Sequence, residues 1–154
     1  MTHERKAMDD ALKELVVPKL RAVGFKGSLP HFRRVASGGL DILTFQFDRY
    51  GGGFIIELAR CSKDGFVTTW GKIIPANKIT AWDLPLNWRH RIQPQVGSST
   101  DSWFRFQNGK VREVASAVLH QLPTVEAWFQ ADAQQVAPAE RPILGLRASA
   151  ELRR

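Results

Sequence analysis

The residues best suited to chemistry lie on neighbouring segments of one predicted sheet. They comprise an imidazole, two guanidinium groups, an amide and two carboxylates: His31, Arg33, Arg34, Gln46, Asp48 and Glu57. A histidine beside a carboxylate can work as a general base, and an arginine fork can hold a carboxylate or a phosphate. Charged pairs across neighbouring strands are also ordinary structural features, and a polar sheet face can simply be solvated. The sequence therefore predicts a candidate site on this face, with binding, catalytic and structural interpretations open.

Glu57 is the most informative member of this set because it lies between Ile56 and Leu58 in an apolar run. A carboxylate buried there needs a cationic partner, since an isolated buried charge is costly. Arg33 and Arg34 are the partners that the sequence suggests.

A second candidate site follows the hairpin, in a segment where tryptophans are interleaved with basic residues. Its members are Trp70, Lys72, Lys78, Trp82, Trp88, Arg89 and Arg91. Aromatic rings and cations together can stack nucleobases and hold phosphates, and they also anchor protein interfaces. The tryptophans could instead pack back onto the sheet and pin a long loop, because large aromatic side chains are mostly buried.

No metal or nucleotide motif accompanies these residues. His3, His31, His90 and His120 have neither HxxxH nor HxH spacing, and Cys61 is the only cysteine. A single cysteine excludes an intramolecular disulfide and a multi-cysteine zinc site. We therefore expect no metal and no cofactor.

The composition is that of a globular domain with excess positive charge. The chain has 154 residues, of which 44% are hydrophobic, and its formal net charge is +7. Arg60–Arg112 alone holds nine Lys or Arg residues against three Asp. The positive electrostatic potential of such a chain favours acidic partners, whether a nucleic acid or an acidic protein surface. No apolar run approaches the length of about 20 residues that a membrane span needs, and the N-terminus lacks a signal-peptide core. We therefore expect a cytoplasmic protein without membrane attachment.

Leu40–Cys61 predicts a β-hairpin that would carry the first candidate site. Large apolar residues alternate with polar ones, and Gly51–Gly53 supplies the positive φ of a tight turn. Turns at Gly51–Gly52 or at Tyr50–Gly53 both place the large apolar side chains on one face, whereas a three-residue turn would mix the faces. The expected pairs are Phe45 with Leu58, Phe47 with Ile56 and Gln46 with Glu57.

The other segments predict helices at both ends of the chain and short strands between them. His3–Val23 has a helical apolar stripe with a kink near Glu14–Val17, caused by Pro18, and Pro123 separates two predicted C-terminal helices. Short strands are expected in Phe25–Val35, Phe66–Trp70, Asn87–Gln93 and Ser102–Gln107. We predict one α+β domain over residues 1–136, with an antiparallel sheet of four to six strands and helices mainly on one face. Residues 137–154 predict a poorly ordered or loosely docked tail.

Four blocks of the sequence carry a resemblance to a known family. VVPKLRAVGFKGSLPHFRR, LTFQFDRYGGGFIIELA, TWGKIIPANKITAWDL and WFRF resemble the bacterial domain-of-unknown-function family 4304, over Ala7–Trp128. Because that family is uncharacterised, the resemblance implies no reaction and no catalytic residues. The size and domain type are similar to those of small α+β immunity or inhibitor proteins, which is a likeness of shape only.

Three functions follow as expectations. The first is a non-enzymatic module that binds a protein partner. The second is a binder of nucleic acid or another acidic ligand, through Lys72, Lys78, Arg89 and Arg91. The third is an enzyme centred on His31, Asp48 and Glu57, which should show a cleft with perturbed pKa values.

Overall fold

The computed structural model of the chain describes residues 1–94 and 102–135, and it begins with two consecutive helices. α1 (His3–Leu15) and α2 (Val17–Ala22) are separated at Val16, which confirms the predicted kink. Pro18 lies in the first turn of α2, where no helical partner needs its missing N–H. α2 ends within one residue of the predicted Val23, and Gly24 follows with a φ of 99°. The next N–H, of Phe25, donates to the Leu20 carbonyl.

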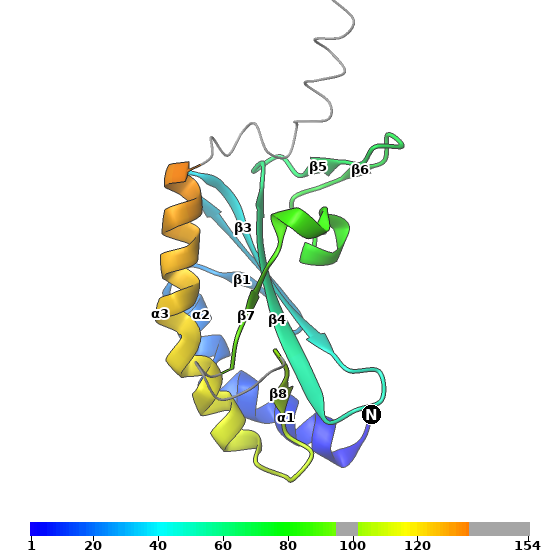
Figure 1. Ribbon diagram of the computed structural model, residues 1–154, viewed down its shortest axis with the longest axis vertical. Coiled ribbons are helices and arrows are strands. Elements are labelled where there is room, and N and C mark those ends of the chain that lie inside the picture. Colours follow the sequence, from blue (N-terminus) through cyan, green and yellow to red (C-terminus); the bar gives the residue numbers. More distant parts are fainter. Residues whose placement is uncertain (95–101, 136–154) are drawn as a thin grey trace, which may run out of the picture.

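The main sheet is antiparallel and has six strands (Figure 1). In chain order the strands are β1 (Lys26–Ser28), β2 (His31–Ala36), β3 (Gly39–Phe47), β4 (Gly53–Cys61), β7 (His90–Ile92) and β8 (Phe104–Arg105). The order across the sheet is β1-β2-β3-β4-β7, and β8 pairs with the beginning of β4. The fold is therefore the α+β class that the sequence predicted.

The β3–β4 hairpin has the predicted faces but not the predicted register. Phe45 lies opposite Ile56 and Gln46 opposite Ile55, so each pair is displaced by two residues from the expected one. The displacement arises because the Asp48 N–H donates to the Gly53 carbonyl, which leaves Arg49–Gly52 as the turn. A shift of two residues keeps every side chain on its face. The prediction that Gln46 faces Glu57 is wrong, because Thr44 occupies that position.

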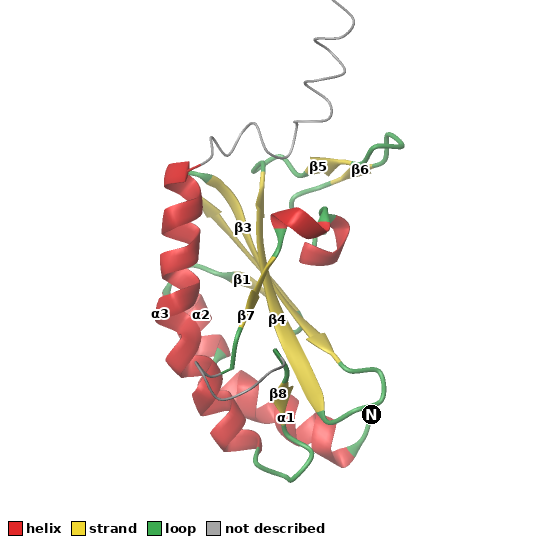
Figure 2. Ribbon diagram, in the orientation of Figure 1, coloured by secondary structure: helices red, strands yellow, loops and turns green. Residues whose placement is uncertain are grey.

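One face of the sheet is covered by α1 and by α3 (Val111–Gln135), as Figure 2 shows. Leu12 of α1 and Val118 of α3 share a buried cluster with Phe45 and Leu58. β8 adds Phe104 to this cluster, where its ring stacks on that of Phe54 with the centroids 5.1 Å apart.

α3 corrects the prediction of two C-terminal helices. It continues through Pro123, which is exposed. Val118 before the proline and Phe129 after it both pack into the same core. Burial on both sides of Pro123 outweighs the lost backbone hydrogen bond, so the helix does not break there.

The opposite face of the sheet is covered by residues 62–89, which we call the arm. It contains β5 (Phe66–Val67), β6 (Ile73–Ile74) and two short 3-10 helices, η1 (Ala81–Asp83) and η2 (Leu86–Trp88). Ile79, Ala81 and Leu84 of the arm pack on Ile42 and Ala59 of the sheet, forming a second buried cluster. Because both faces are covered, every residue of β4 is buried. The polar face is therefore not a solvated surface. The predicted tail, residues 137–154, lies outside the described residues.

Candidate functional site

The first set of predicted site residues is divided between the two faces of the sheet. Arg34 lies on the helix-covered face, in register with Asp41. His31, Arg33, Gln46 and Glu57 lie on the arm-covered face. Asp48 belongs to neither group, because its carboxylate accepts the Tyr50 N–H within the β3–β4 turn at 2.9 Å.

Arg34 takes part in a buried ion network that links the sheet to α3. Its Nη2 lies 2.8 Å from Asp41, and its Nη1 lies 2.6 Å from Glu126. Asp41 also accepts hydrogen bonds from Arg60, and it is completely buried. The guanidinium of Arg34 additionally lies over the Phe25 ring, 4.3 Å from its centroid. Two cations thus balance two carboxylates, which is the arrangement that buried charges require.

Asp41 and Arg60 were missed by the sequence prediction, although a signal was present. Strand alternation places Asp41 on the same face as Leu43 and Phe45, and Arg60 on the same face as Leu58. A charge in such a position is expected to need a partner of opposite sign on the same face.

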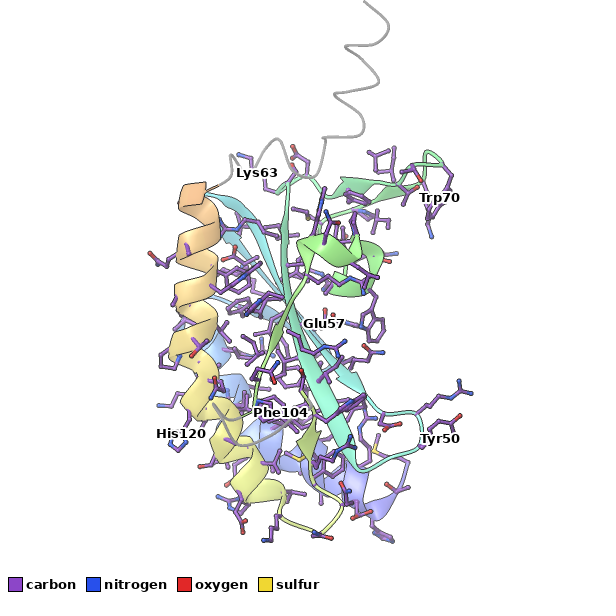
Figure 3. The ribbon with its side chains drawn as sticks, viewed as in Figure 1. Tyr50, Glu57, Lys63, Trp70, Phe104 and His120 are labelled. Atoms are coloured by element: carbon purple, nitrogen blue, oxygen red, sulfur yellow. The ribbon has the colours of Figure 1, made fainter. Side chains whose placement is uncertain are left out.

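Four polar residues form a row across the arm-covered face. The strand registers place His31 of β2 beside Thr44 of β3, Thr44 beside Glu57 of β4, and Glu57 beside Arg91 of β7. We call His31, Thr44, Glu57 and Arg91 the polar row. Figure 3 shows Glu57 in the middle of the sheet.

Glu57 is buried, as predicted, but its cations are not the predicted ones. Its carboxylate oxygens lie 3.9 Å from Nη1 of Arg89 and 3.8 Å from Nη2 of Arg91. Both arginines belong to the second candidate site, so the two predicted sites meet at this carboxylate. The expectation that Arg33 or Arg34 would pair with Glu57 is wrong.

Polar side chains on this face fix the arm to the sheet. Thr44 Oγ1 accepts the Ala81 N–H at 3.1 Å, and Arg33 Nε donates to the Ile79 carbonyl. Within the arm itself, Arg89 donates from Nε and Nη2 to the Leu84 carbonyl, at 3.0 and 2.8 Å, and from Nη2 to the Trp82 carbonyl. Most of the predicted polar surface therefore satisfies the backbone of an irregular segment.

In the polar row, His31 is the residue whose pKa is shifted by its surroundings. Its ring meets the Trp82 ring edge to face at 5.1 Å, and its Nδ1 is buried without a hydrogen-bond partner among the described residues. Burial and the Arg33 charge lower the pKa of His31, and Asp83 opposes this shift. A neutral imidazole could accept a proton, but Thr44 lies between it and Glu57 in the row. The geometry does not assemble His31, Asp48 and Glu57 into one catalytic group.

Cys61 is a packing residue. It is buried in the second cluster, and burial raises the pKa of its thiol to about 12. The thiolate required for nucleophilic chemistry is therefore scarce at neutral pH.

The tryptophans of the second site have three different environments. Trp88 is half-buried against the Phe66 ring, edge to face at 5.5 Å. Trp82 covers His31 and is 44% exposed. Trp70 lies in the turn between β5 and β6 and is 77% exposed, and Figure 3 shows it at the far end of that hairpin. Lys72, in the same turn, and Lys78 are exposed as well. Trp88 therefore packs as a loop anchor, whereas Trp70 is open to a partner.

Two further features are absent from residues 1–94 and 102–135. Those residues hold no group of three His, Cys, Asp or Glu side chains placed to ligate a metal ion. Their helices also include none with the length and apolarity needed to cross a bilayer.

The chain was compared with protein families, curated proteins and solved structures. Neither a curated protein nor a solved structure matches it. A family model described as a domain of unknown function (DUF4304) matches residues 16–132. This match includes the whole sheet, the arm and most of α3. The chain therefore belongs to the DUF4304 family.

Proposed function

We propose that this protein is a non-enzymatic module that binds a protein partner through its arm. The observation that carries the proposal is the exposure of two large apolar residues on the β5–β6 hairpin, Trp70 at 77% and Ile73 at 71%. Tryptophan is among the residues that contribute most to the free energy of binding at protein interfaces. A hairpin that extends from the sheet, as Figure 1 shows for β5 and β6, can place such a side chain in a partner's pocket.

The two sides of the β5–β6 hairpin differ in a way that supports this proposal. Phe66 and Ile74, which face each other across the two strands, are half-buried and pack against the second core cluster. Trp70 and Ile73 are not part of that cluster. Because Arg33 and Thr44 hold the arm to the sheet, the hairpin is positioned before a partner arrives. Such preorganisation lowers the entropic cost of binding.

The charge around the hairpin indicates the chemistry of the partner. Lys63, Lys72 and Lys78 are exposed on the arm, against Asp64 and Asp83. Together with the net charge of +7, these lysines favour an acidic protein surface that surrounds an apolar pocket. This fits the inhibitor-like or immunity-like role that the size of the domain suggests, and we place that role in the cytoplasm.

The test compares partner capture by the intact protein and by a variant of the hairpin. Tagged protein carrying Trp70→Ser and Ile73→Ser should lose a partner that the wild type retains. With that partner purified, the loss should be at least about tenfold in Kd, as expected for an interface anchor. Both residues are exposed, so the fold should persist, and circular dichroism checks that it does.

Tyr50→Ser is the matched control, because Tyr50 is 86% exposed on the other hairpin. It should leave the affinity unchanged. Recovery of the same partner with the same affinity by the Trp70/Ile73 variant would overturn the proposal. Capture of nucleic acid instead, with an affinity that falls steeply as salt is raised, would favour the alternative of an acidic-ligand binder.

A further inference from the structure

A groove of about 460 Å³ lies on the arm-covered face, away from the tip of the β5–β6 hairpin. It is located where β1 stops pairing with β2. Val35 and Leu40 belong to its lining on the sheet side, Ala76 and Asn77 line it from the arm, and Lys26 and Arg33 contribute the cations. The volume falls within the range of small-molecule sites, about 300–1,000 Å³.

The two cations are held directly opposite each other. The register of β1 and β2 pairs Lys26 with Arg33, and like charges in that position repel. In the part of the chain that the structure describes, neither residue forms an ion pair with a carboxylate, and Asp83 acts on Arg33 only at longer range. An anion placed between Lys26 and Arg33 would relieve this repulsion.

Arg33 has the donors that such an anion needs. Its Nε donates to the Ile79 carbonyl, which fixes the side chain beside the groove. Its two Nη groups take part in none of the hydrogen bonds among the described residues. A guanidinium held in this way can bind a carboxylate through charge-assisted hydrogen bonds.

The apolar part of the groove lies beside the cations. Val35 is 69% exposed although it is a large apolar residue, and Leu40 faces it across β2 and β3. A ligand that covers Val35 would remove apolar surface from water while its charged end meets Arg33.

We propose that this groove binds a carboxylate that carries an apolar group, either the C-terminus of a peptide or a free aliphatic acid. Lys26 and Arg33 contribute two positive charges and Asp83 one negative charge, so the site is complementary to a monoanion. This inference concerns residues separate from Trp70 and Ile73, so it can fail without affecting the proposed protein-binding role, and the reverse also holds.

The probe is N-acetyl-leucine, whose carboxylate and isobutyl group reproduce the two parts of the ligand. Titration into the full chain should shift the amide signals of Lys26, Gly27, Val35 and Asn77 in heteronuclear NMR spectra. A millimolar Kd is expected for so small a molecule. Octanoate, as the free aliphatic acid, and an acetylated tripeptide ending in leucine distinguish the two sources of the carboxylate by their relative affinities.

Lys26→Gln should weaken binding by about threefold to fivefold, the usual contribution of an exposed ion pair. Lys26 is exposed, so this variant should fold normally. Arg33→Gln should weaken binding more, by at least about tenfold, but it also removes the bond to Ile79 and needs a thermal-unfolding check. Lys63→Gln, a substitution of an exposed lysine outside the groove lining, is the matched control and should have no effect.

Two results would overturn the proposal. One is equal binding by N-acetyl-leucinamide, which lacks the charge and would show that the groove is merely apolar. The other is the absence of shifts at the groove amides with about 10 mM N-acetyl-leucine, well above a millimolar Kd.

Discussion

The two buried carboxylates of the central strands, Asp41 and Glu57, are each matched by arginines from other elements. Asp41 meets Arg34 and Arg60, and Glu57 meets Arg89 and Arg91. The apolar neighbours of Glu57 were enough to predict its burial and its need for a cation. Its partners could not be predicted, because they depend on how the arm folds over the sheet, and the sequence of the arm has no regular period.

The pH dependence of stability provides a test of the environment of His31. The pKa of His31 lies below its ordinary value of 6.5 in the folded protein, because of burial and the Arg33 charge, with Asp83 acting in the opposite direction. The unfolded chain therefore binds more protons than the folded chain just below pH 6.5, so the free energy of unfolding should rise with pH there and level off above it. Urea titrations from about pH 5 to pH 8 measure this slope.

His31→Gln should reduce that slope without abolishing it. Burial also lowers the pKa of His90, whose ring stacks on Trp128 at 5.5 Å, so His90 contributes a slope of the same sign. A variant with the full wild-type slope would show that His31 titrates in the folded protein as it does in the unfolded chain.

At the scale of elements, the sequence predicted which face of the sheet each hairpin side chain occupies, but it did not predict the register in which the two strands pair. Alternation placed Phe45, Phe47, Ile56 and Leu58 on one face, and all four lie in or against the same core cluster. The observed register differs from the predicted one by two residues. Gly51–Gly53 permits several turns that leave every side chain on the same face, so the face pattern does not select among them. The hydrogen bond between Asp48 and Gly53, which selects one of them, cannot be inferred from alternation alone.

In α3, tertiary packing outweighs a strong local preference: Pro123 favours a helix break, but the helix continues through it. Replacing Pro123 with alanine should restore a backbone donor and remove a steric clash at an exposed position. We expect the free energy of unfolding to increase by about 2 kcal/mol, less than the full cost of a mid-helix proline because the unfolded chain also gains freedom. Chemical denaturation measures the change.

The neighbouring substitution Thr124→Ala is the control for Pro123→Ala. Thr124 is also exposed on α3, and its replacement should change the free energy of unfolding by less than about 1 kcal/mol, through helix propensity alone. A neutral result would contradict this prediction, and a destabilising one would show that Pro123 stabilises α3 in its present form.

At the scale of the whole molecule, two cores share one pair of strands. Consecutive residues of β3 serve different cores: Leu43 packs with the helices, and Ile42 packs with the arm. The helix-side core was predictable, because helices and hairpin both have clear apolar stripes. The arm-side core was not predicted. One interpretation of the sequence was that tryptophans pack a long loop onto the sheet, and Trp88 does pack against this core.

Ile42→Ala and Leu43→Ala test whether the two cores unfold together. Each substitution removes a fully buried side chain and should cost about 2–5 kcal/mol. Because β3 and β4 are common to both cores, each variant should still unfold in a single transition, with far-UV circular dichroism and tryptophan fluorescence coinciding. An early, separate fluorescence transition in Ile42→Ala alone would show that the arm unfolds independently of the sheet.

The strands at the borders of the main sheet affect how copies of this protein behave at high concentration. β1 forms one border, and β7 and β8 share the other along β4. β1 and β7 are three residues long and β8 only two, and each contains a cation: Lys26, Arg91 and Arg105. β1 is also interrupted by Gly27, whose φ is 111°. Short, charged and irregular borders make poor templates for the backbone of another chain. The backbone hydrogen-bonding groups at these two borders would otherwise be available to a second molecule. The sheet is thus protected there against edge-to-edge association into fibrils.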